Sequence, residues 1–457
     1  MDKIQEICKN EIEKLQEYID NSTDFFLHGD FENFERGLSI ILNNVHDCIC
    51  VSKLNSITED TDFKGIIKEY AACDGISKLS KRQVQVQFKT GSKRTIWSYY
   101  GKQSKGKSSI DRHVGLSYLG FIKKASPMYV SSSSITSVLC PSFSIGQQLM
   151  EEMGVSGSYN RIRNLSIELG QQVISEGIRS VIGQDESMDG KRVVVMIDGG
   201  RSRTRLENGY YTMLGNPKFD TDWREVKLLA ILVLDENGKI ERKELPLYDI
   251  TVNDIQEAMS KLTEALILLN VAAAKEVQFI SDGATCFWKR IEQVFGTASV
   301  EQHKITYSLD YYHAVEHLSD LVHQMADDTI NEKERKSLFT QLKSSLWLGN
   351  IEVLLTEVKK FCQAKGKEIK DKLLTEINYF EKHKNRMRYH LFRTQKWLCG
   401  SGAVESAIRR IINLRFKAPA SFWLVEHLEP LCFLRAAFLA GRWKILLQNL
   451  NFKGDNF

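Results

Sequence analysis

The chain has 457 residues, of which 42% are hydrophobic and 26% are charged, and its formal net charge is +4 at pH 7. This length and composition indicate a folded protein of about two to four domains, and they argue against a disordered chain or a membrane span. The nine cysteines are scattered rather than paired, and the N-terminus lacks the apolar core of a signal peptide. We therefore expect a cytoplasmic protein with reduced thiols.

The first segment, residues 1–76, shows the apolar spacing of helices. Two runs of apolar residues recur at helical spacing, and the charged residues around them are acidic overall. An acidic surface disfavours DNA contact, so the pattern predicts either a helical bundle or a dimerisation element. The two runs are Ile4, Ile7, Cys8, Ile12, Leu15 and Ile19, and then Phe31, Phe34, Leu38, Ile41, Leu42 and Val45.

The next segment, residues 77–185, is predicted to be a basic DNA-binding region. Twelve Lys or Arg residues and a single acid, Asp111, lie between Lys78 and Lys124. A local excess of positive charge of this kind is the electrostatic footprint expected for a phosphate backbone.

The sequence of this basic region predicts a β-hairpin. Residues 83–88 and 95–100 alternate in polarity on either side of turn residues at 90–93. Basic and aromatic side chains on such a hairpin can hold phosphates and stack on bases, whereas the alternative is a solvated edge hairpin whose lysines discourage aggregation. The candidate DNA contacts here are Lys93, Arg94 and Trp97.

Two helical patterns between residues 142 and 182 flank glycines at 154 and 157. The arrangement is compatible with a helix-turn-helix that reads DNA with the start of its second helix, but any two short packed helices look alike. The polar residues near that helix start are Asn160, Arg161 and Arg163.

Three carboxylates follow or begin strongly patterned segments. A run of mostly β-branched residues at 193–197 predicts a buried strand ending at Asp198, and the two glycines that follow are expected to break it. A second strand, 277–281, ends in the same way at Asp282, and Glu405 lies at the start of a helical pattern. Two strand-terminal aspartates and a helical glutamate could form a divalent-metal site.

The order of elements around these acids predicts a ribonuclease-H-like fold. Three strands suited to antiparallel pairing are followed by alternating helices and strands. In such a sheet, the neighbouring ends of strands one and four bring Asp198 and Asp282 together, and the last helix delivers Glu405. The expected elements after the first strand are strands at 223–235 and 239–251, a helix at 254–270, the strand ending at 282, and a strand at 304–309.

We therefore expect a multidomain α/β protein whose ribonuclease-H-like catalytic domain is formed by residues 186–313 and 401–445. Helical periodicity throughout residues 314–400 predicts an all-helical insertion before the last catalytic helix. The insertion ends in a basic run at 382–388, which could contact DNA.

Five separated sequence blocks occur in the same order as in the bacterial insertion-sequence transposases of the Kra-type DDE family, and the chain resembles that family. The family is related to Mutator-like transposases. The resemblance extends over about residues 190–445, whereas about the first 140 residues resemble the family only loosely. The blocks are 197–201, 222–229, 281–283, 309–314 and 400–406, followed by 413–417 and 422–423.

The resemblance implies that Asp198, Asp282 and Glu405 are a catalytic triad. It also places Asp310 and His313 on the family's Asp/Cys-x-x-His motif, which would order DNA or the shell of the active site. Cleavage and transfer of DNA strands suit two Mg²⁺ ions held by carboxylates, with Mn²⁺ as a substitute.

The partners and the location also follow from the resemblance. The partners would be double-stranded DNA, as element ends and as target, and further copies of the chain in a homodimer or a larger synaptic assembly. No membrane partner is expected. The location would be the bacterial cytoplasm, with nucleoid association when DNA is bound.

Basic residues near the three acids are candidate DNA contacts or supports of the active site. Arg201, Arg203 and Arg205 alternate after Asp198 and would share one face if the strand continued, gripping phosphates, although a solvated charge run is the alternative. Trp423 could stack on an unpaired base, but a core position is favoured for it. Further candidates on or beyond the helix of Glu405 are Arg409, Arg410, Arg415 and Lys417.

The sequence thus predicts a DNA transposase that binds the terminal inverted repeats of an insertion sequence and catalyses two-metal strand cleavage and transfer. One alternative is a domesticated descendant that binds DNA without moving it. The other is a ribonuclease-H-like nuclease, which would cut without joining. Transfer of a 3′-hydroxyl end into target DNA separates the three.

Overall fold

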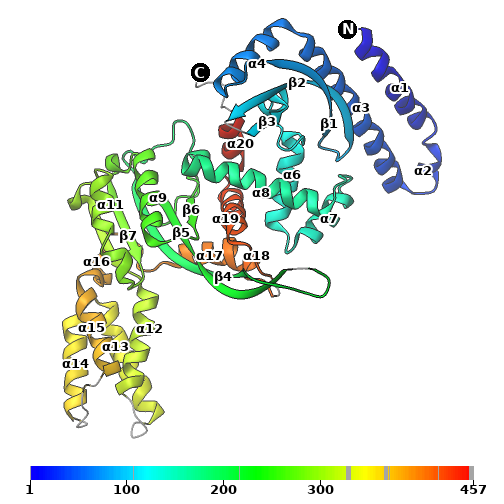
Figure 1. Cartoon of the computed structure of the whole chain (residues 1–457). Coiled ribbons are helices and arrows are strands. Elements are labelled where there is room, and N and C mark those ends of the chain that lie inside the picture. Colours follow the sequence, from blue (N-terminus) through cyan, green and yellow to red (C-terminus); the bar gives the residue numbers. More distant parts are fainter. Residues whose placement is uncertain are drawn as a thin grey trace. The chain divides into compact units, whose positions relative to one another are not determined.

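The computed structural model of the chain (Figure 1) describes residues 2–105, 108–215, 217–325, 331–364, 369, 371–419 and 421–451. Contacts divide the chain into two units, Met1–Ser175 with Leu447–Phe457, and Glu176–Leu446. The protein is therefore multidomain, with helices and sheet in both units, as the sequence predicts. Within the described residues, none of the helices combines the length and the apolar character that a bilayer crossing requires.

The first unit packs helices against a three-stranded antiparallel sheet, in the order β1-β2-β3. The predicted N-terminal helices and β-hairpin are both confirmed, with Gln83 opposite Trp97 in the hairpin. Phe63 and Ile67 of the N-terminal helices share a buried cluster with Tyr99 of the sheet, so one core spans residue 76. The bounds are α1 (Asp2–Asp20), α2 (Thr23–Leu27), α3 (Phe31–Glu59), α4 (Thr61–Cys73), β1 (Leu79–Gln87), β2 (Lys93–Lys105) and β3 (Ser108–Arg112).

Further helices complete the first unit. The two helices predicted around residue 154 are α7 and α8, and Gly154 between them has a φ of +74°, the left-handed backbone that glycine adopts without strain. The bounds are α5 (Val114–Tyr118), α6 (Pro127–Leu139), α7 (Phe143–Glu152), α8 (Tyr159–Glu176) and α20 (Trp443–Asn451), of which the residues from Leu447 on belong to this unit.

The second unit is built on a five-stranded sheet in the order β6-β5-β4-β7-β8. The first three strands in the chain, β4, β5 and β6, pair antiparallel, and β7 and β8 then pair in parallel beside β4. The expected strand order and the adjacency of strands one and four are thus present. The bounds are β4 (Arg192–Tyr211), β5 (Pro217–Leu234), β6 (Leu247–Thr251), β7 (Glu276–Ser281) and β8 (Ile305–Leu309).

Two sequence-based predictions about these strands are wrong. Gly199 and Gly200 do not end β4: they pair with Lys227 and Val226 of β5, and the strand continues to Tyr211. The third strand does not begin at residue 239, because β6 starts at Leu247. The preceding residues form a turn in which Asp235 accepts hydrogen bonds from backbone N–H groups, and only an isolated bridge follows it.

Helices pack against the sheet, among them α9 and α17, and helices also make up the region between β8 and Glu405. The predicted all-helical character of that region is confirmed for its described residues, with α12 packed against α13 and α15. The bounds are η1 (Gly177–Val181), α9 (Ile255–Leu268), η2 (Val271–Ala273), α10 (Thr285–Trp288), α11 (Ile291–Thr297), η3 (Gln302–Lys304), α12 (Tyr311–Met325), α13 (Glu332–Trp347), α14 (Ile351–Ala364), α15 (Asp371–His383), η4 (Lys384–Arg386), α16 (Tyr389–Thr394), α17 (Gly402–Ile408), the π-helical η5 (Arg409–Asn413), α18 (Leu414–Phe416) and α19 (Val425–Leu439).

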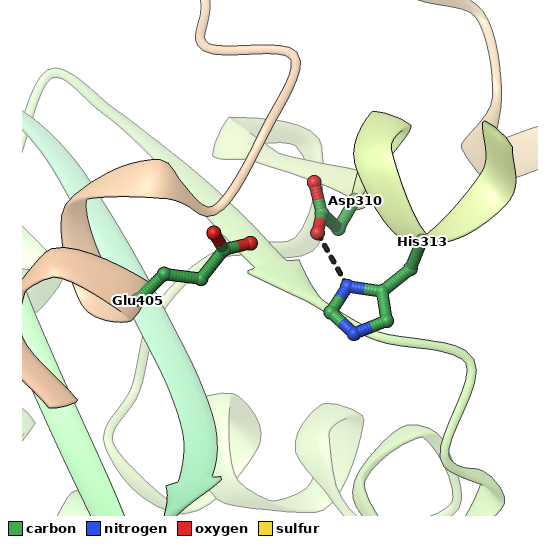
Figure 2. Close-up of side chains that lie close together, drawn as sticks. All are labelled: Asp310, His313 and Glu405. Carbon is green, nitrogen blue, oxygen red and sulfur yellow. Dashed lines mark hydrogen bonds and ion pairs between the residues drawn. The ribbon is translucent and has the colours of Figure 1, made fainter. Parts of the chain in front are cut away.

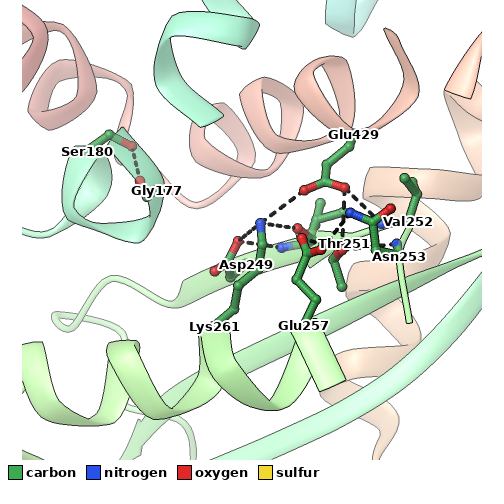
Figure 3. Close-up of polar contacts among 10 residues, drawn as sticks. Gly177, Ser180, Asp249, Thr251, Val252, Asn253, Glu257, Lys261 and Glu429 are labelled. Carbon is green, nitrogen blue, oxygen red and sulfur yellow. Dashed lines mark hydrogen bonds and ion pairs between the residues drawn. The ribbon is translucent and has the colours of Figure 1, made fainter. Parts of the chain in front are cut away.

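A buried ionic network joins three elements of this unit (Figure 3). Lys261 on α9 lies 3.0 Å from a carboxylate oxygen of Glu429 on α19 and 3.6 Å from one of Asp249 on β6. Glu429 also accepts a hydrogen bond from the backbone N–H of Val252. The network therefore fixes α9 and α19 against the edge strand β6.

Candidate metal centre

The two aspartates of the predicted triad lie where the parallel pairing of β4 and β7 ends, Asp198 within β4 and Asp282 just after β7. The parallel pairing of β4 and β7 reaches Met196 and Ile280, and each aspartate comes two residues later in its strand's direction. Asp282 follows the end of β7, where its Oδ1 accepts a hydrogen bond of 3.0 Å from the backbone N–H of Ala284. Strand pairing therefore brings Asp198 and Asp282 to the same level of the sheet.

The third acid, Glu405, is carried to this edge by α17. A Cβ on Gly200 would lie 3.0 Å from Ile408 and 3.2 Å from Ile412. Glycine at this point of β4 therefore permits the close approach of α17 and η5 to the sheet. The Glu405 side chain is exposed and its Oε1 lies 3.0 Å from the hydroxyl of Ser401.

A buried glutamine fixes the segment that leads into α17. Gln278 of β7 donates a hydrogen bond of 2.7 Å to the carbonyl of Leu398 and accepts one of 3.1 Å from the N–H of the same residue. This contact, together with a bond from Tyr311 N to Cys399 O, holds the chain so that Ser401 meets Asp310.

Asp310, the first residue after β8, has all of its hydrogen-bonding capacity used. Its Oδ1 accepts from the N–H groups of Tyr312 and Ser401, and its Oδ2 lies 2.6 Å from His313 Nδ1 and 2.9 Å from Ser401 Oγ. Burial by itself would raise the pKa of Asp310, but these hydrogen bonds hold the pKa below its ordinary value. The carboxylate is therefore ionised and fully hydrogen-bonded.

Asp310, His313 and Glu405 form a cluster that could hold a metal ion (Figure 2). Among the described residues, they are the trio of His, Cys, Asp or Glu side chains whose ligand atoms all lie within 4.8 Å of one another. The hydrogen bond to Asp310 is the main cause that raises the pKa of His313 to about 9. His313 is therefore an imidazolium at neutral pH, whereas a histidine ligand must be neutral.

Asp198 interacts electrostatically with the other two acids of the predicted triad. The pKa of Asp198 is raised to about 6, mainly by burial, and the negative charges of Asp282 and Glu405 raise it as well. The hydrogen bond from the Gly199 N–H and the positive charge of His313 lower it. Three carboxylates near one another hold excess negative charge, and their oxygens are the donors that Mg²⁺ prefers. The donor chemistry of the three acids therefore suits a divalent cation, but the trio whose ligand atoms lie within 4.8 Å of one another does not include Asp198 or Asp282, so a cation held by the three acids stays a prediction.

The continuation of β4 puts the alternating arginines on one face of the strand. Arg201 is exposed. Arg203 donates a hydrogen bond of 2.8 Å to the carbonyl of Ala418 and lies over the ring of Phe422 at 5.1 Å, and Arg205 lies over a phenylalanine ring of β5 at 5.8 Å. Arg201 is therefore the most accessible of the three arginines, whereas Arg203 and Arg205 pack against aromatic rings.

The basic residues after Glu405 also include both exposed and buried side chains. Arg409, Arg410 and Lys417 are exposed. Arg415 is buried, and its guanidinium lies 4.9 Å from the ring centre of Trp423, which is buried as well. Trp423 is hydrogen-bonded through its backbone to β4, so this pair supports the strand from within.

The hairpin candidates lie in the first unit. Lys93 is exposed, and the Trp97 side chain is 43% exposed. Arg94 is half-buried, donates a hydrogen bond of 3.1 Å to Asn44, and has its Nε 3.7 Å from the buried carboxylate of Asp47. Lys93 and Trp97 are therefore exposed to solvent, while Arg94 is held by α3.

Sequence reasoning missed the contacts that the helical region makes with the loop of Asp282. A Cβ on Gly283 would collide with the ring of Tyr379 on α15, and Lys382 donates a hydrogen bond of 2.6 Å to Thr285. Ser401, which links Asp310 with Glu405, was also missed. A local pattern signals neither, although the glycine that follows Asp282 is a hint of close approach.

Comparisons with known proteins add little to this geometry. No protein-family model and no curated protein matches the sequence. The chain is similar to a chain of a solved structure described as "Drosophila P element transposase strand transfer complex", with 14% sequence identity, 73% of this chain and 83% of that chain covered, and a TM-score of 0.27. A TM-score of 0.27 is too low to bear on fold or function.

Proposed function

We propose that the chain is a DNA transposase of the DDE type, with a ribonuclease-H-like catalytic domain, that cleaves the ends of an insertion sequence of the Kra-type family and joins them to target DNA. The proposal rests on one observation. Asp198, on β4, and Asp282, just after β7, lie where the pairing of these two strands ends, and α17, which carries Glu405, packs against β4. The resemblance of the surrounding sequence blocks to that family gives the three acids their proposed roles.

The three acids would hold the divalent cations, Mg²⁺ or Mn²⁺. When bound, such ions would activate the attacking water or 3′-hydroxyl and neutralise charge at the phosphate. Burial raises the pKa of Asp198, and a nearby cation would favour its ionised form.

The imidazolium of His313 has a complementary role. Asp310 accepts its Nδ1–H, which leaves the Nε2–H as a donor on the other side of the ring. A charged donor beside Glu405 would orient a phosphate oxygen of the scissile strand. Exposed Arg201, on the same strand as Asp198, would hold a neighbouring phosphate.

The proposal is tested by cleavage and strand transfer with labelled duplexes made from the DNA that flanks the coding region. The native chain should give joined product in Mg²⁺ or Mn²⁺, and Glu405→Gln, which keeps the shape but loses the charge, should give none. Glu426→Gln, at an exposed glutamate on α19, is the matched control and should join as the native chain does.

Other outcomes favour the alternatives. Specific binding of the flanking DNA without cleavage by the native chain would point to a domesticated DNA-binding protein. Cleavage without joining would point to a nuclease. Joining by Glu405→Gln at the native rate would remove Glu405 from the site.

A further inference from the structure

A cavity of about 610 Å³ in the first unit is lined mainly by basic and polar residues. It lies where the β1–β2 turn, the turn at residues 123–124 and the start of α8 come together. Its lining contains one acid, Glu151, which accepts a hydrogen bond from Gln147. The basic residues that line it are Lys93, Lys123, Lys124 and Arg161.

Arg161 is fixed in this cavity by neutral groups. Its Nε donates a hydrogen bond of 3.0 Å to the side-chain carbonyl of Gln87, and its Nη2 donates one of 2.8 Å to the backbone carbonyl of Lys123. Gln87 is buried and is itself held by a bond to the carbonyl of Gly91. Within the described part of the chain, no carboxylate forms an ion pair with Arg161.

The charge of Arg161 is therefore costly where it stands. Burial lowers the pKa of its guanidinium from the ordinary value, because a charge is held there without a counter-ion. An anion entering the cavity would offset this cost.

The turn that carries two of the lysines has an unusual backbone. Lys123 and Lys124 have φ values of +47° and +65°, between Ile122 and Ala125, which are bridged to each other. Turns with positive φ at both central residues favour Asn and Gly, and lysine is disfavoured there. Backbone strain of this kind is a pointer to binding sites when it accompanies a cavity.

The two lysines differ in their partners. Lys123 forms an ion pair of 2.7 Å with Glu168 on α8. Lys124 is exposed, and it forms no ion pair with any of the described residues. Lys124 is therefore available to a ligand in the cavity together with Arg161.

We propose that this cavity binds a phosphate of the DNA backbone, held by Arg161 and Lys124, with Lys93 of the hairpin nearby. The volume exceeds that of one phosphate and admits the adjoining sugars. The choice of DNA rests on the proposed function, and the site uses none of the three acids of the second unit.

Binding of the full-length chain to a fluorescent double-stranded oligonucleotide of arbitrary sequence, measured against salt concentration, tests this site. Arg161→Gln and Lys124→Gly should each weaken binding by about tenfold, because each removes a charged hydrogen bond to phosphate. The slope of log affinity against log salt should fall in magnitude by about 0.9 for each phosphate that the protein no longer neutralises.

Two features keep the test independent of misfolding. Glycine suits the positive φ of residue 124, so Lys124→Gly should keep or raise the melting temperature while it weakens binding. Arg36→Gln changes an exposed arginine on α3 that does not line the cavity, and it should retain native affinity. Equal weakening by Arg36→Gln, or an unchanged salt slope in both cavity variants, would overturn the proposal.

Inorganic phosphate separates a DNA ligand from a small phosphate compound. If phosphate raises the melting temperature of the native chain but not of Arg161→Gln, while DNA affinity is equal in both, the DNA assignment is wrong. A native chain that binds DNA through this cavity but joins no ends would leave the site standing and overturn the proposed function.

Discussion

At the scale of single residues, Asp310 and His313 carry opposite charges because of their hydrogen bonds. Asp310 is completely buried and accepts bonds from two backbone N–H groups as well as from His313 and Ser401. Its negative charge keeps His313 protonated, with a pKa of about 9. A protonated imidazole donates hydrogen bonds and cannot ligate a cation, so we expect His313 to face a phosphate oxygen.

The charge of His313 should make stability depend on pH. Its pKa in the folded chain, about 9, lies above the ordinary 6.5, so its protonation stabilises the fold fully below about pH 6.5 and this contribution is lost as the pH rises through 9. We expect His313→Gln to unfold more easily than the native chain at pH 6 by on the order of 1 kcal/mol, a figure reduced because the ring is 34% exposed. Urea unfolding across pH 6–10 measures the difference.

The same measurement in an Asp310→Asn background is the control. Removing the carboxylate removes the main cause of the raised pKa of His313, so the effect of His313→Gln should then no longer vary with pH. If the stability difference between the native chain and His313→Gln is equal at pH 6 and pH 10, then His313 is not protonated in the folded chain.

At the scale of elements, the site depends on how closely α17 and η5 approach β4. Gly200 faces Ile408 and Ile412 of those helical segments, whereas a Cβ on Gly199 would meet the side chain of Glu225, at 2.8 Å from its Oε1. The two adjacent glycines therefore have different surroundings: one is confined by the apolar core and the other by a flexible, exposed side chain.

This difference predicts opposite outcomes for the two alanine substitutions. Gly200→Ala should destabilise the fold by about 1–2 kcal/mol and reduce strand transfer, because α17 and Glu405 are pushed outward. Gly199→Ala should change stability by less than about 0.5 kcal/mol, since the Glu225 side chain can move. Thermal unfolding and strand-transfer rates measure both effects, and equal losses in the two variants would refute the packing role of Gly200.

The elements that sequence could predict are those whose pattern is local. Buried strands such as β4 and β7 read as apolar runs, and helical periodicity predicted the region around α12 to α15. The predicted end of β4 was wrong because Gly200 serves a contact with Ile408, which no neighbouring residue signals. The Ser401 contact with Asp310 and the arrangement at Arg161 were out of reach for the same reason, since each joins segments distant in sequence.

At the scale of the whole molecule, the second unit has a network of charges buried in its interior. Lys261 lies between Asp249 and Glu429, and both carboxylates are almost inaccessible to solvent. Burial raises the pKa of Asp249 to about 6 even with Lys261 beside it. Lys261 is the cation that compensates the negative charge of both buried carboxylates, so the stability of the network depends on it.

Replacing Lys261 with Met should therefore destabilise the second unit by about 3–5 kcal/mol near pH 8, because two buried carboxylates lose their cation. The charge of Lys261 lowers the pKa of Asp249, so its removal should raise that pKa further above 6, and the loss should shrink as the pH falls toward 6, where Asp249 becomes protonated in both chains. Thermal or urea unfolding at pH 5 and pH 8 measures this.

The control for that substitution is Lys191→Met. Lys191 forms an ion pair of 2.8 Å with Glu244, with the two side chains 29% and 33% exposed, and such a pair contributes at most about 1 kcal/mol. The role given to the network would be contradicted if Lys261→Met lost no more stability than Lys191→Met, or if its loss of stability did not vary with pH.

Binding of Mn²⁺ to the full-length chain, followed by electron paramagnetic resonance, decides which residues hold the cation. If Asp198, Asp282 and Glu405 are the ligands, Asp198→Asn and Glu405→Gln should each weaken binding by more than about tenfold. His313→Gln should bind Mn²⁺ as tightly or more tightly, because a positive charge near the site is removed. Binding that is lost in His313→Gln and retained in Asp198→Asn would contradict the proposed site.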